Sequence, residues 1–196
     1  MSAEGFRFPA TTARAEVRDR GSRFLAVVSP ARDESAAACE IGRLEEEFRD
    51  ATHVCWAWRI GDPPRERSSD AGEPGGTAGA PILQALRTHE MSDAALAVVR
   101  WFGGTKLGRG GLIRAYGAAA RAVLEDVPRI SRVPTCELTI EVPHERAGAV
   151  KRLLRPPTIE LVDEVYSSVA RLRLRAHRAQ EDALRAALAD LGAKLL

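Results

Sequence analysis

A stretch containing two prolines divides the sequence into two unequal parts. Residues 127–134 include Pro128 and Pro134 and show neither helical nor strand periodicity. Proline lacks an N–H donor and restricts the residue before it, so such a stretch interrupts regular structure. It follows a long helical pattern and precedes a strand pattern, and we interpret it as a linker. The sequence therefore predicts two domains, at residues 1–128 and 135–196.

The second part has the more regular pattern. Alternation of apolar and polar residues predicts four strands, at 136–142, 158–166, 169–176 and 193–196. Apolar residues at helical spacing predict helices at 145–155 and 181–191. The order is strand, helix, strand, strand, helix, strand. This βαββαβ order is typical of ferredoxin-like domains.

The first part mixes helices and strands less regularly. Its apolar patterns predict strands at 12–17, 23–29, 52–60 and 94–102. They predict helices at 33–48, 81–88 and 112–125. Two glycine-rich segments, 61–79 and 103–111, are left as loops. The fold class predicted for the whole chain is α+β, with two domains.

Composition excludes several classes of protein. Hydrophobic residues make up 45% and charged residues 29%, which is the profile of a folded globular protein. No run approaches the roughly 20 apolar residues that span a bilayer, and the N-terminus lacks a signal-peptide pattern. We therefore expect a cytoplasmic protein with no membrane contact. The three cysteines are widely spaced and form no CxxC pair, so we expect no disulfide framework, no metal site and no cofactor.

The two glycine-rich loops are the strongest functional features. Long loops of this kind often turn their backbone amides toward a ligand. In the second loop, Gly110 and Gly111 lie near a helix start, where free amides and the helix dipole favour an anion. Between Ala94 and Leu124 there is no acidic residue, and there are five basic ones: Arg100, Lys106, Arg109, Arg114 and Arg121. A phosphate, free or in a nucleic acid, would suit this surface. A tight turn with solvated arginines is the alternative.

These residues predict a binding face. Its anion-binding members are Arg100, Gly103, Gly104, Lys106, Arg109, Gly110, Gly111 and Arg114. The first loop would form its wall, through Asp70, Glu73, Gly75, Gly76 and Thr77. The spacing around Lys106 does not fit a Walker A loop, and the GxGxxG fingerprint also fails. ATP hydrolysis and dinucleotide binding are therefore disfavoured.

Three ordered stretches carry a family resemblance. They are THVCWAW at 52–58, SDAGEPGGTAG at 69–79 and RWFGGTKLGRGGLIRAY at 100–116. In this order they resemble the signature stretches of the YigZ/IMPACT family, and the similarity runs from about residue 22 to 124. Trp56 and Trp101 stand where tyrosine is common in the family. The aromatic character is kept, so the resemblance holds.

The resemblance implies a fold and a field of activity. It implies an N-terminal domain like the second domain of ribosomal protein S5, and a C-terminal domain like the last domain of elongation factor G. The eukaryotic relative carries a different partner-binding domain, which is not found in this sequence, and modulates a translation-control kinase through protein contacts, so we do not expect the kinase role here. What the resemblance still implies is a role near RNA or the ribosome.

Other candidate functional residues could instead have purely structural roles. On strand 52–60, His53 and Cys55 lie on one semi-polar face, which we expect to be open near the loops. They could form a nucleophilic pair, although residues two apart on a strand lie about 7 Å from each other. Asp70 and Glu73 could act as acid and base or cap turns of their own loop.

The second domain has one further candidate site. Three arginines share a strand face, where a basic stripe could meet RNA or pair with neighbouring carboxylates: Arg171, Arg173 and Arg175.

The sequence thus favours a non-enzymatic RNA- or ribosome-associated protein involved in the regulation of translation. One alternative is an enzyme that acts on a phosphorylated small molecule or a phosphodiester, since S5-like folds also occur in phosphotransferases. Another is a protein-interaction module with a protein partner.

Overall fold

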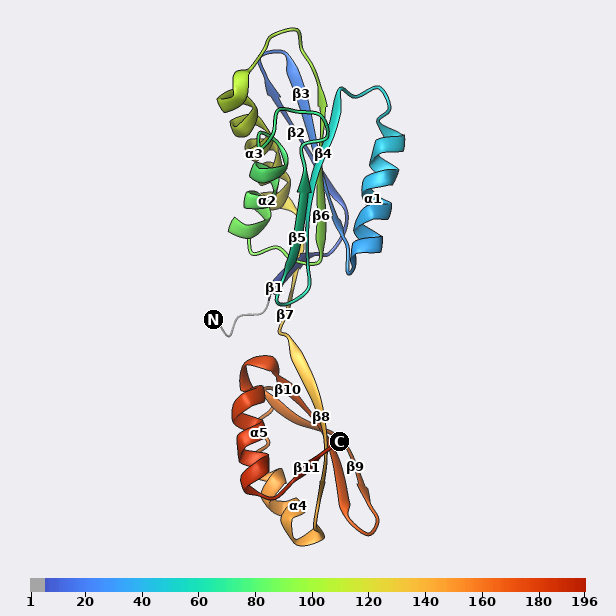
Figure 1. The fold of residues 1–196 in the computed structure, drawn as a ribbon, viewed down its shortest axis with the longest axis vertical. Helices are drawn as coiled ribbons and strands as arrows, with labels where there is room; N and C mark the ends of the chain where they lie inside the picture. Colours follow the sequence, from blue (N-terminus) through green and yellow to red (C-terminus); the bar gives the residue numbers. More distant parts are fainter. Residues whose placement is uncertain (1–5) are drawn as a thin grey trace. The chain divides into compact units, whose positions relative to one another are not determined.

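The computed structural model describes residues 6–196 and divides them into two compact units, Phe6–Arg132 and Val133–Leu196 (Figure 1). Each unit has its own hydrophobic core. The N-terminal unit has the S5-domain-2-like fold and the C-terminal unit has the ferredoxin-like fold, which confirms the α+β class predicted from the sequence. None of the helices in these residues is long and apolar enough to cross a membrane.

A five-stranded antiparallel sheet forms the centre of the N-terminal unit. In spatial order its strands are β2 (Ala13–Asp19), β3 (Ser22–Pro30), β6 (Ala94–Trp101), β4 (His53–Ile60) and β5 (Arg65–Ser69). The central strands β3 and β6 are buried over almost their whole length. This explains why their sequences are nearly continuous apolar runs rather than alternating ones.

Helices cover both faces of this sheet (Figure 1). Helix α1 (Glu34–Glu47) lies on one face, and Asp33 caps it by accepting a 2.8 Å hydrogen bond from the Ala36 amide. Helices α2 (Gly79–Thr88) and α3 (Gly108–Asp126) lie on the other face. The main core of the unit forms between these two helices and the sheet.

The layer formed by α2 and α3 shows that the expectation of an open sheet face at His53 and Cys55 was wrong. Cys55 and Ala57 are both 0% exposed and belong to the core beneath α2 and α3. The opposite face, with Trp56 and Trp58, packs toward α1. Both faces of β4 are therefore covered, and on the face of Cys55 only the outer positions, His53 and Arg59, keep partial exposure.

Three predictions for the N-terminal unit were wrong, and in the C-terminal unit the helix predicted at 145–155 ends at Lys151. The expected loop 61–79 contains edge strand β5, whose charged sequence Arg-Glu-Arg hides the strand pattern but suits a sheet edge. The expected linker contains β7 (Arg129–Arg132), which pairs with β1 (Phe6–Pro9). Helix α3 begins at Gly108 rather than Leu112. The sequence pattern missed its first turn because glycines, which have low intrinsic helix propensity, make up most of that turn.

The C-terminal unit follows the predicted βαββαβ order. Its elements are β8 (Thr135–Val142), α4 (His144–Lys151), β9 (Ile159–Tyr166), β10 (Ala170–His177), the short 3₁₀ turn η1 (Arg178–Gln180), α5 (Glu181–Asp190) and β11 (Lys194–Leu195). The sheet order is β11-β8-β10-β9. Alternate residues of β8 and β10 pack on the two helices, while the others form a polar outer face.

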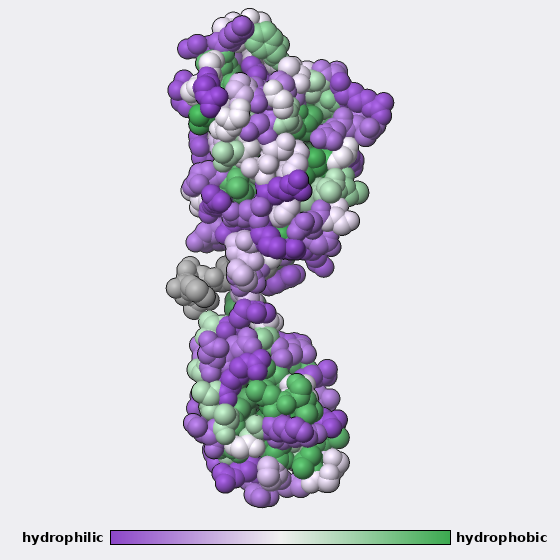
Figure 2. Space-filling model, viewed as in Figure 1, coloured by the Kyte–Doolittle hydropathy of each residue, from purple (hydrophilic) through white to green (hydrophobic). Residues whose placement is uncertain are grey.

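The two units differ at the surface. In the view of Figure 2 the N-terminal unit is mainly hydrophilic, with scattered hydrophobic residues. Hydrophobic residues gather on the C-terminal unit around the end of the chain, where Leu195 and Leu196 are exposed. No interior charged cluster interrupts the core of the C-terminal unit within the described residues. The buried charged side chains of the described residues, Glu73, Asp93 and Arg100, therefore all lie in the N-terminal unit.

Candidate functional site

The loop between β5 and α2 is organised by Asp70. Its carboxylate accepts backbone hydrogen bonds from Gly76 (2.8 Å), Ala78 (2.8 Å) and Gly79 (2.9 Å). Burial alone would raise the pKa of the Asp70 carboxyl, but these N–H donors outweigh it and hold the pKa below its usual value. Ala78 and Gly79 stand at the start of α2, so Asp70 serves as the missing side-chain cap of that helix.

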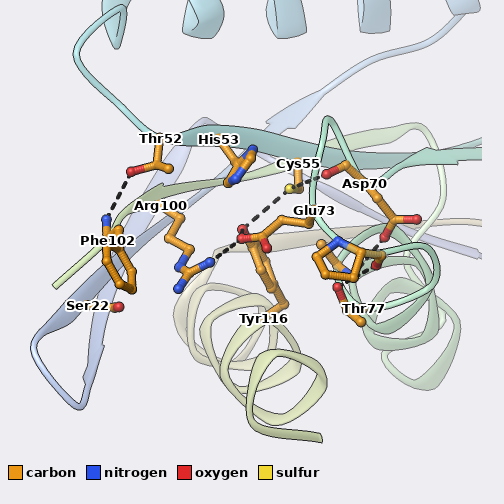
Figure 3. A network of polar contacts seen from close by, with 12 residues as sticks. Ser22, Thr52, His53, Cys55, Asp70, Glu73, Thr77, Arg100, Phe102 and Tyr116 are labelled. Atoms are coloured by element: carbon orange, nitrogen blue, oxygen red, sulfur yellow. Dashed lines mark hydrogen bonds and ion pairs between the residues drawn. The ribbon is translucent and has the colours of Figure 1, made fainter. Parts of the chain in front are cut away.

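A buried polar network lies beside this loop (Figure 3). The Arg100 Nη1 atom lies 2.5 Å from Oε1 of Glu73, and the Tyr116 hydroxyl donates to the same oxygen at 2.8 Å. The Cys55 thiol lies 3.4 Å from the Tyr116 hydroxyl and 3.0 Å from the Asp70 carbonyl oxygen. The network joins β4, β6, α3 and the loop, and so fixes the loop on the sheet.

This network disfavours catalysis by the sequence-predicted carboxylates and by Cys55. Asp70 is engaged by three amides, and Glu73 is engaged by Arg100 and Tyr116. Burial, with the nearby charges of Glu73 and Asp70, raises the pKa of Cys55 to about 12. Burial also raises the pKa of Tyr116. A thiol of this kind is not an activated nucleophile.

His53 also lacks the geometry of a base for Cys55. Its Nδ1 atom is 2.8 Å from the carbonyl oxygen of Ala71, and the thiol of Cys55 is directed to other partners. Within residues 6–196, no group of three or more His, Cys, Asp or Glu side chains is arranged to hold a metal ion. The site therefore offers binding surfaces more readily than reactive groups.

The loop after β6 is anchored at two points. The Phe102 amide donates to Oγ1 of Thr52 at 3.0 Å, and the Gly103 amide donates to Oγ of Ser22 at 3.2 Å. Gly103 also lies directly on the backbone of Gly21, where an added Cβ would stand 1.8 Å from the carbonyl carbon. Contrary to expectation, the Gly103 amide is therefore used by the fold and is not free for an anion.

The beginning of α3 is open to solvent. Leu107 is buried and makes no side-chain cap, whereas Gly108, Arg109 and Gly110 are exposed. The first turn contains no acidic residue. The first amides of a helix lack intrahelical partners and carry the positive end of the helix dipole. This turn can therefore bind an anion.

Two basic side chains flank this open turn. Lys106 and Arg109 are exposed, and no carboxylate lies within ion-pair distance of either among residues 6–196. Arg109 reaches across to the first loop, where its Nη2 donates to the carbonyl oxygen of Gly75 at 2.9 Å. The two glycine-rich loops thus meet, as the sequence suggested. Gly104 lies in the same exposed loop with a φ of +87°.

A pocket of about 420 Å³ lies in front of this turn. It is lined by Thr52, His53, Pro74, Arg100, Phe102, Lys106, Leu107, Gly108, Arg109 and Leu112. Four of these residues, Pro74, Phe102, Leu107 and Leu112, give it an apolar wall. Sequence reasoning had assigned no role to these four, because nothing in a single sequence distinguishes a pocket wall from a core.

Two arginines of the predicted binding face have different surroundings from those expected. Arg100 lines the pocket but is only 6% exposed and is paired with Glu73, so its charge is offset. Arg114 lies outside this pocket and lines a second hollow between α2 and α3, together with Arg121.

Gly76 borders that second hollow, while Gly111 is buried against Leu107. Thr77 is buried and donates to the carbonyl oxygen of Pro74.

The arginines of the C-terminal sheet are paired with carboxylates on neighbouring strands. The nitrogen-to-oxygen distances are 2.7 Å for Arg171–Glu141, 3.8 Å for Arg173–Asp163 and 2.9 Å for Arg175–Glu137. These charges alternate in sign across the face. The stripe is therefore a less concentrated positive surface than the sequence alone suggests.

Comparison with known proteins places the chain in a family. Residues 20–124 match the Impact N-terminal domain. The chain belongs to the IMPACT family. An IMPACT family member of Thermus thermophilus is 39% identical over 154 residues, covering 79% of this chain and 83% of that protein. The IMPACT family member YigZ of Escherichia coli is 30% identical over 190 residues, covering 95% of this chain and 93% of that protein.

The fold of the IMPACT chain also matches a solved structure. A crystal structure described as that of a hypothetical protein is 29% identical and has a TM-score of 0.68, covering 98% of this chain and 97% of the other. The family resemblance carried by the three loop stretches and the predicted two-domain α+β fold are thereby confirmed. The matched region contains both glycine-rich loops and the pocket between them.

Proposed function

We propose that this IMPACT family protein binds RNA through phosphate groups at the start of α3. It would act as a non-enzymatic RNA- or ribosome-associated protein in the regulation of translation. The proposal includes a cytoplasmic location and contact with a protein partner. The translation link follows from the resemblance to the IMPACT family, and the binding chemistry follows from the site.

One observation carries the proposal. The first turn of α3 contains the exposed residues Gly108, Arg109 and Gly110 and no acidic residue, and the cations Lys106 and Arg109 have no ion-pair partner among residues 6–196. Free amides, a helix dipole and cations together favour a phosphate over a neutral ligand. The buried network behind the turn keeps this arrangement rigid, so little ordering free energy is lost on binding.

The experiment is an RNA-binding series over salt concentration. Single-stranded RNA should bind with an affinity that falls steeply with salt, because phosphate contacts release counterions. The double variant Lys106→Ala/Arg109→Ala should bind more weakly. It should also reduce the slope of log K against log salt by about 1.4, at roughly 0.7 per lost contact with a single strand.

A matched control removes the same charge elsewhere. Arg146→Ala/Lys194→Ala also deletes one arginine and one lysine, both exposed and both in the C-terminal unit. We expect this control to keep the wild-type affinity and slope. If both double variants lose affinity equally, binding depends on net charge alone and the proposed site is wrong.

A further inference from the structure

The pocket in front of α3 is too apolar to serve phosphate alone. Besides the polar residues that line it, the pocket has an apolar wall formed by Pro74, Phe102, Leu107 and Leu112. Phosphate is strongly hydrated and gains nothing from an apolar wall. A ligand that fills this volume therefore has a flat or apolar part in addition to an anionic part. At about 420 Å³, the pocket falls in the range of small-molecule sites.

Phe102 provides a surface for a flat ring. Its side chain is 47% exposed, which is unusual for a large aromatic residue at the end of a buried strand. Its position is nevertheless held, because its amide donates to Thr52 and its ring centroid lies 5.6 Å from the Arg100 guanidinium carbon. A fixed, exposed phenyl ring is the feature on which single-stranded nucleic acid bases stack.

Arg100 supplies a second, independent indication of a ligand. Its guanidinium points from β6 into the space between Phe102 and Glu73 (Figure 3). Nη1 is bound to Glu73, but the buried Nε atom has no hydrogen-bond partner. A buried donor without a partner costs about 1–3 kcal/mol, so such groups in native proteins call for an explanation. Arg100 lines the pocket, and a shift of its side chain would bring this buried donor to a hydrogen-bond acceptor on a bound ligand.

The three features lie around one pocket and match one kind of ligand. There is an aromatic platform at Phe102, a buried donor at Arg100, and a cationic, amide-rich edge at Lys106 and Arg109. A nucleotide has a flat ring, acceptor atoms on that ring and a phosphate. We infer that the pocket takes one unstacked nucleobase of a single-stranded RNA, with the adjoining phosphate at the start of α3. This inference rests on the proposed function and extends it to the base.

The test compares RNA with a chain that has no bases. An RNA tetramer and a ribose-phosphate chain of equal length carry the same charge, and both are titrated against the full-length protein. We expect the tetramer to bind more tightly. Phe102→Ala should weaken tetramer binding by about five- to 150-fold, the range measured for loss of one base-stacking aromatic. The same variant should leave binding of the base-free chain unchanged.

Two further variants separate stacking from loss of apolar surface or of folding. Phe102→Leu keeps an apolar side chain but removes the ring, so it should behave like Phe102→Ala. Ile113→Ala removes an exposed apolar side chain from α3 outside this pocket and should bind the tetramer like the wild type. Phe102→Leu with wild-type affinity would overturn the stacking role.

The outcomes distinguish this inference from the proposed function. If the base-free chain binds as tightly as the tetramer, phosphate binding stands and the base pocket is wrong. If neither chain binds at low salt, the proposed function and the base pocket both fail. If uridine monophosphate binds as tightly as the tetramer, the ligand is a free nucleotide, and the assignment to an RNA strand is overturned.

Discussion

Arg100 and Glu73 form a buried ion pair that fastens the first glycine-rich loop to the central strand β6. Their side chains are 7% and 3% exposed, and Nη1 lies 2.5 Å from Oε1. A pair buried this deeply contributes through what its loss would leave behind, since one partner alone is an uncompensated buried charge. The position of the pocket wall therefore depends on two residues 27 positions apart in the chain.

Glu73→Ala should destabilise the N-terminal unit by about 3–5 kcal/mol, because it leaves the Arg100 charge and the Tyr116 hydroxyl without their acceptor. Glu73→Gln should cost less, since an amide oxygen still accepts. Urea unfolding followed by tryptophan fluorescence measures this unit alone, because all three tryptophans, Trp56, Trp58 and Trp101, lie in it. Equal stability of Glu73→Ala and wild type would show that the pair is not held in solution.

Replacing Asp70 should change how stability depends on pH. Its folded pKa lies below the ordinary value of 3.8, so its contribution is present above that value and is lost as the pH falls through the folded pKa. Asp70→Asn should be less stable than wild type by about 2 kcal/mol at pH 7, because a neutral amide cannot accept all three N–H bonds.

The difference between wild type and Asp70→Asn should shrink in acid. It is measured by repeating the urea unfolding between pH 7 and pH 2. A difference that stays constant down to pH 2 would mean that the carboxylate charge does not hold the loop.

Much of this organisation was predictable from the sequence, and part of it was not. Periodicity indicated the C-terminal unit because its strands alternate cleanly, as in Leu172 and Leu174 between the arginines of β10. It missed β5, where charged residues occupy both faces of an edge strand. The glycine-rich loops were recognisable from the sequence as the stretches that carry the family resemblance. The pairing of Arg100 with Glu73 was not, because a long-range ion pair leaves no local pattern.

Gly103→Ala should disrupt the loop after β6. The added Cβ would stand 1.8 Å from the Gly21 carbonyl carbon and 2.2 Å from the Ser22 nitrogen, so two backbone segments must separate. We expect a loss of stability of about 1–3 kcal/mol, the usual cost of overpacking, together with weaker RNA binding. Gly75→Ala is the control, since its Cβ meets nothing within 4 Å. Both are compared by thermal unfolding, and a stable Gly103→Ala protein would contradict the close approach.

The three cysteines should react with a thiol reagent in a fixed order. Cys39 is exposed and should react first, Cys136 is half-buried and should follow, and Cys55 should react only on unfolding. With its pKa near 12, Cys55 has a thiolate fraction of about one in ten thousand at pH 8. Labelling with dithionitrobenzoate, with and without denaturant, gives the order. Fast labelling of the folded protein that disappears in Cys55→Ala would show that Cys55 is a reactive thiol and would contradict this prediction.

The arginine stripe of β10 should contribute little to RNA binding. Arg171, Arg173 and Arg175 face carboxylates on neighbouring strands, so a phosphate approaching them must displace an existing ion pair. Exposed pairs of this kind each contribute about 0–1 kcal/mol to stability, so the triple alanine variant should fold.

Its RNA affinity should stay close to that of the wild type across the salt series, while Lys106→Ala/Arg109→Ala loses affinity. The contrast is informative because the triple variant of the stripe removes three charges, whereas the double variant of the loop removes only two. A mechanism based on net charge predicts the larger loss for the stripe, whereas a localised phosphate site predicts it for the loop. The opposite result, with binding lost only in the triple variant, would move the RNA site to the sheet of the C-terminal unit.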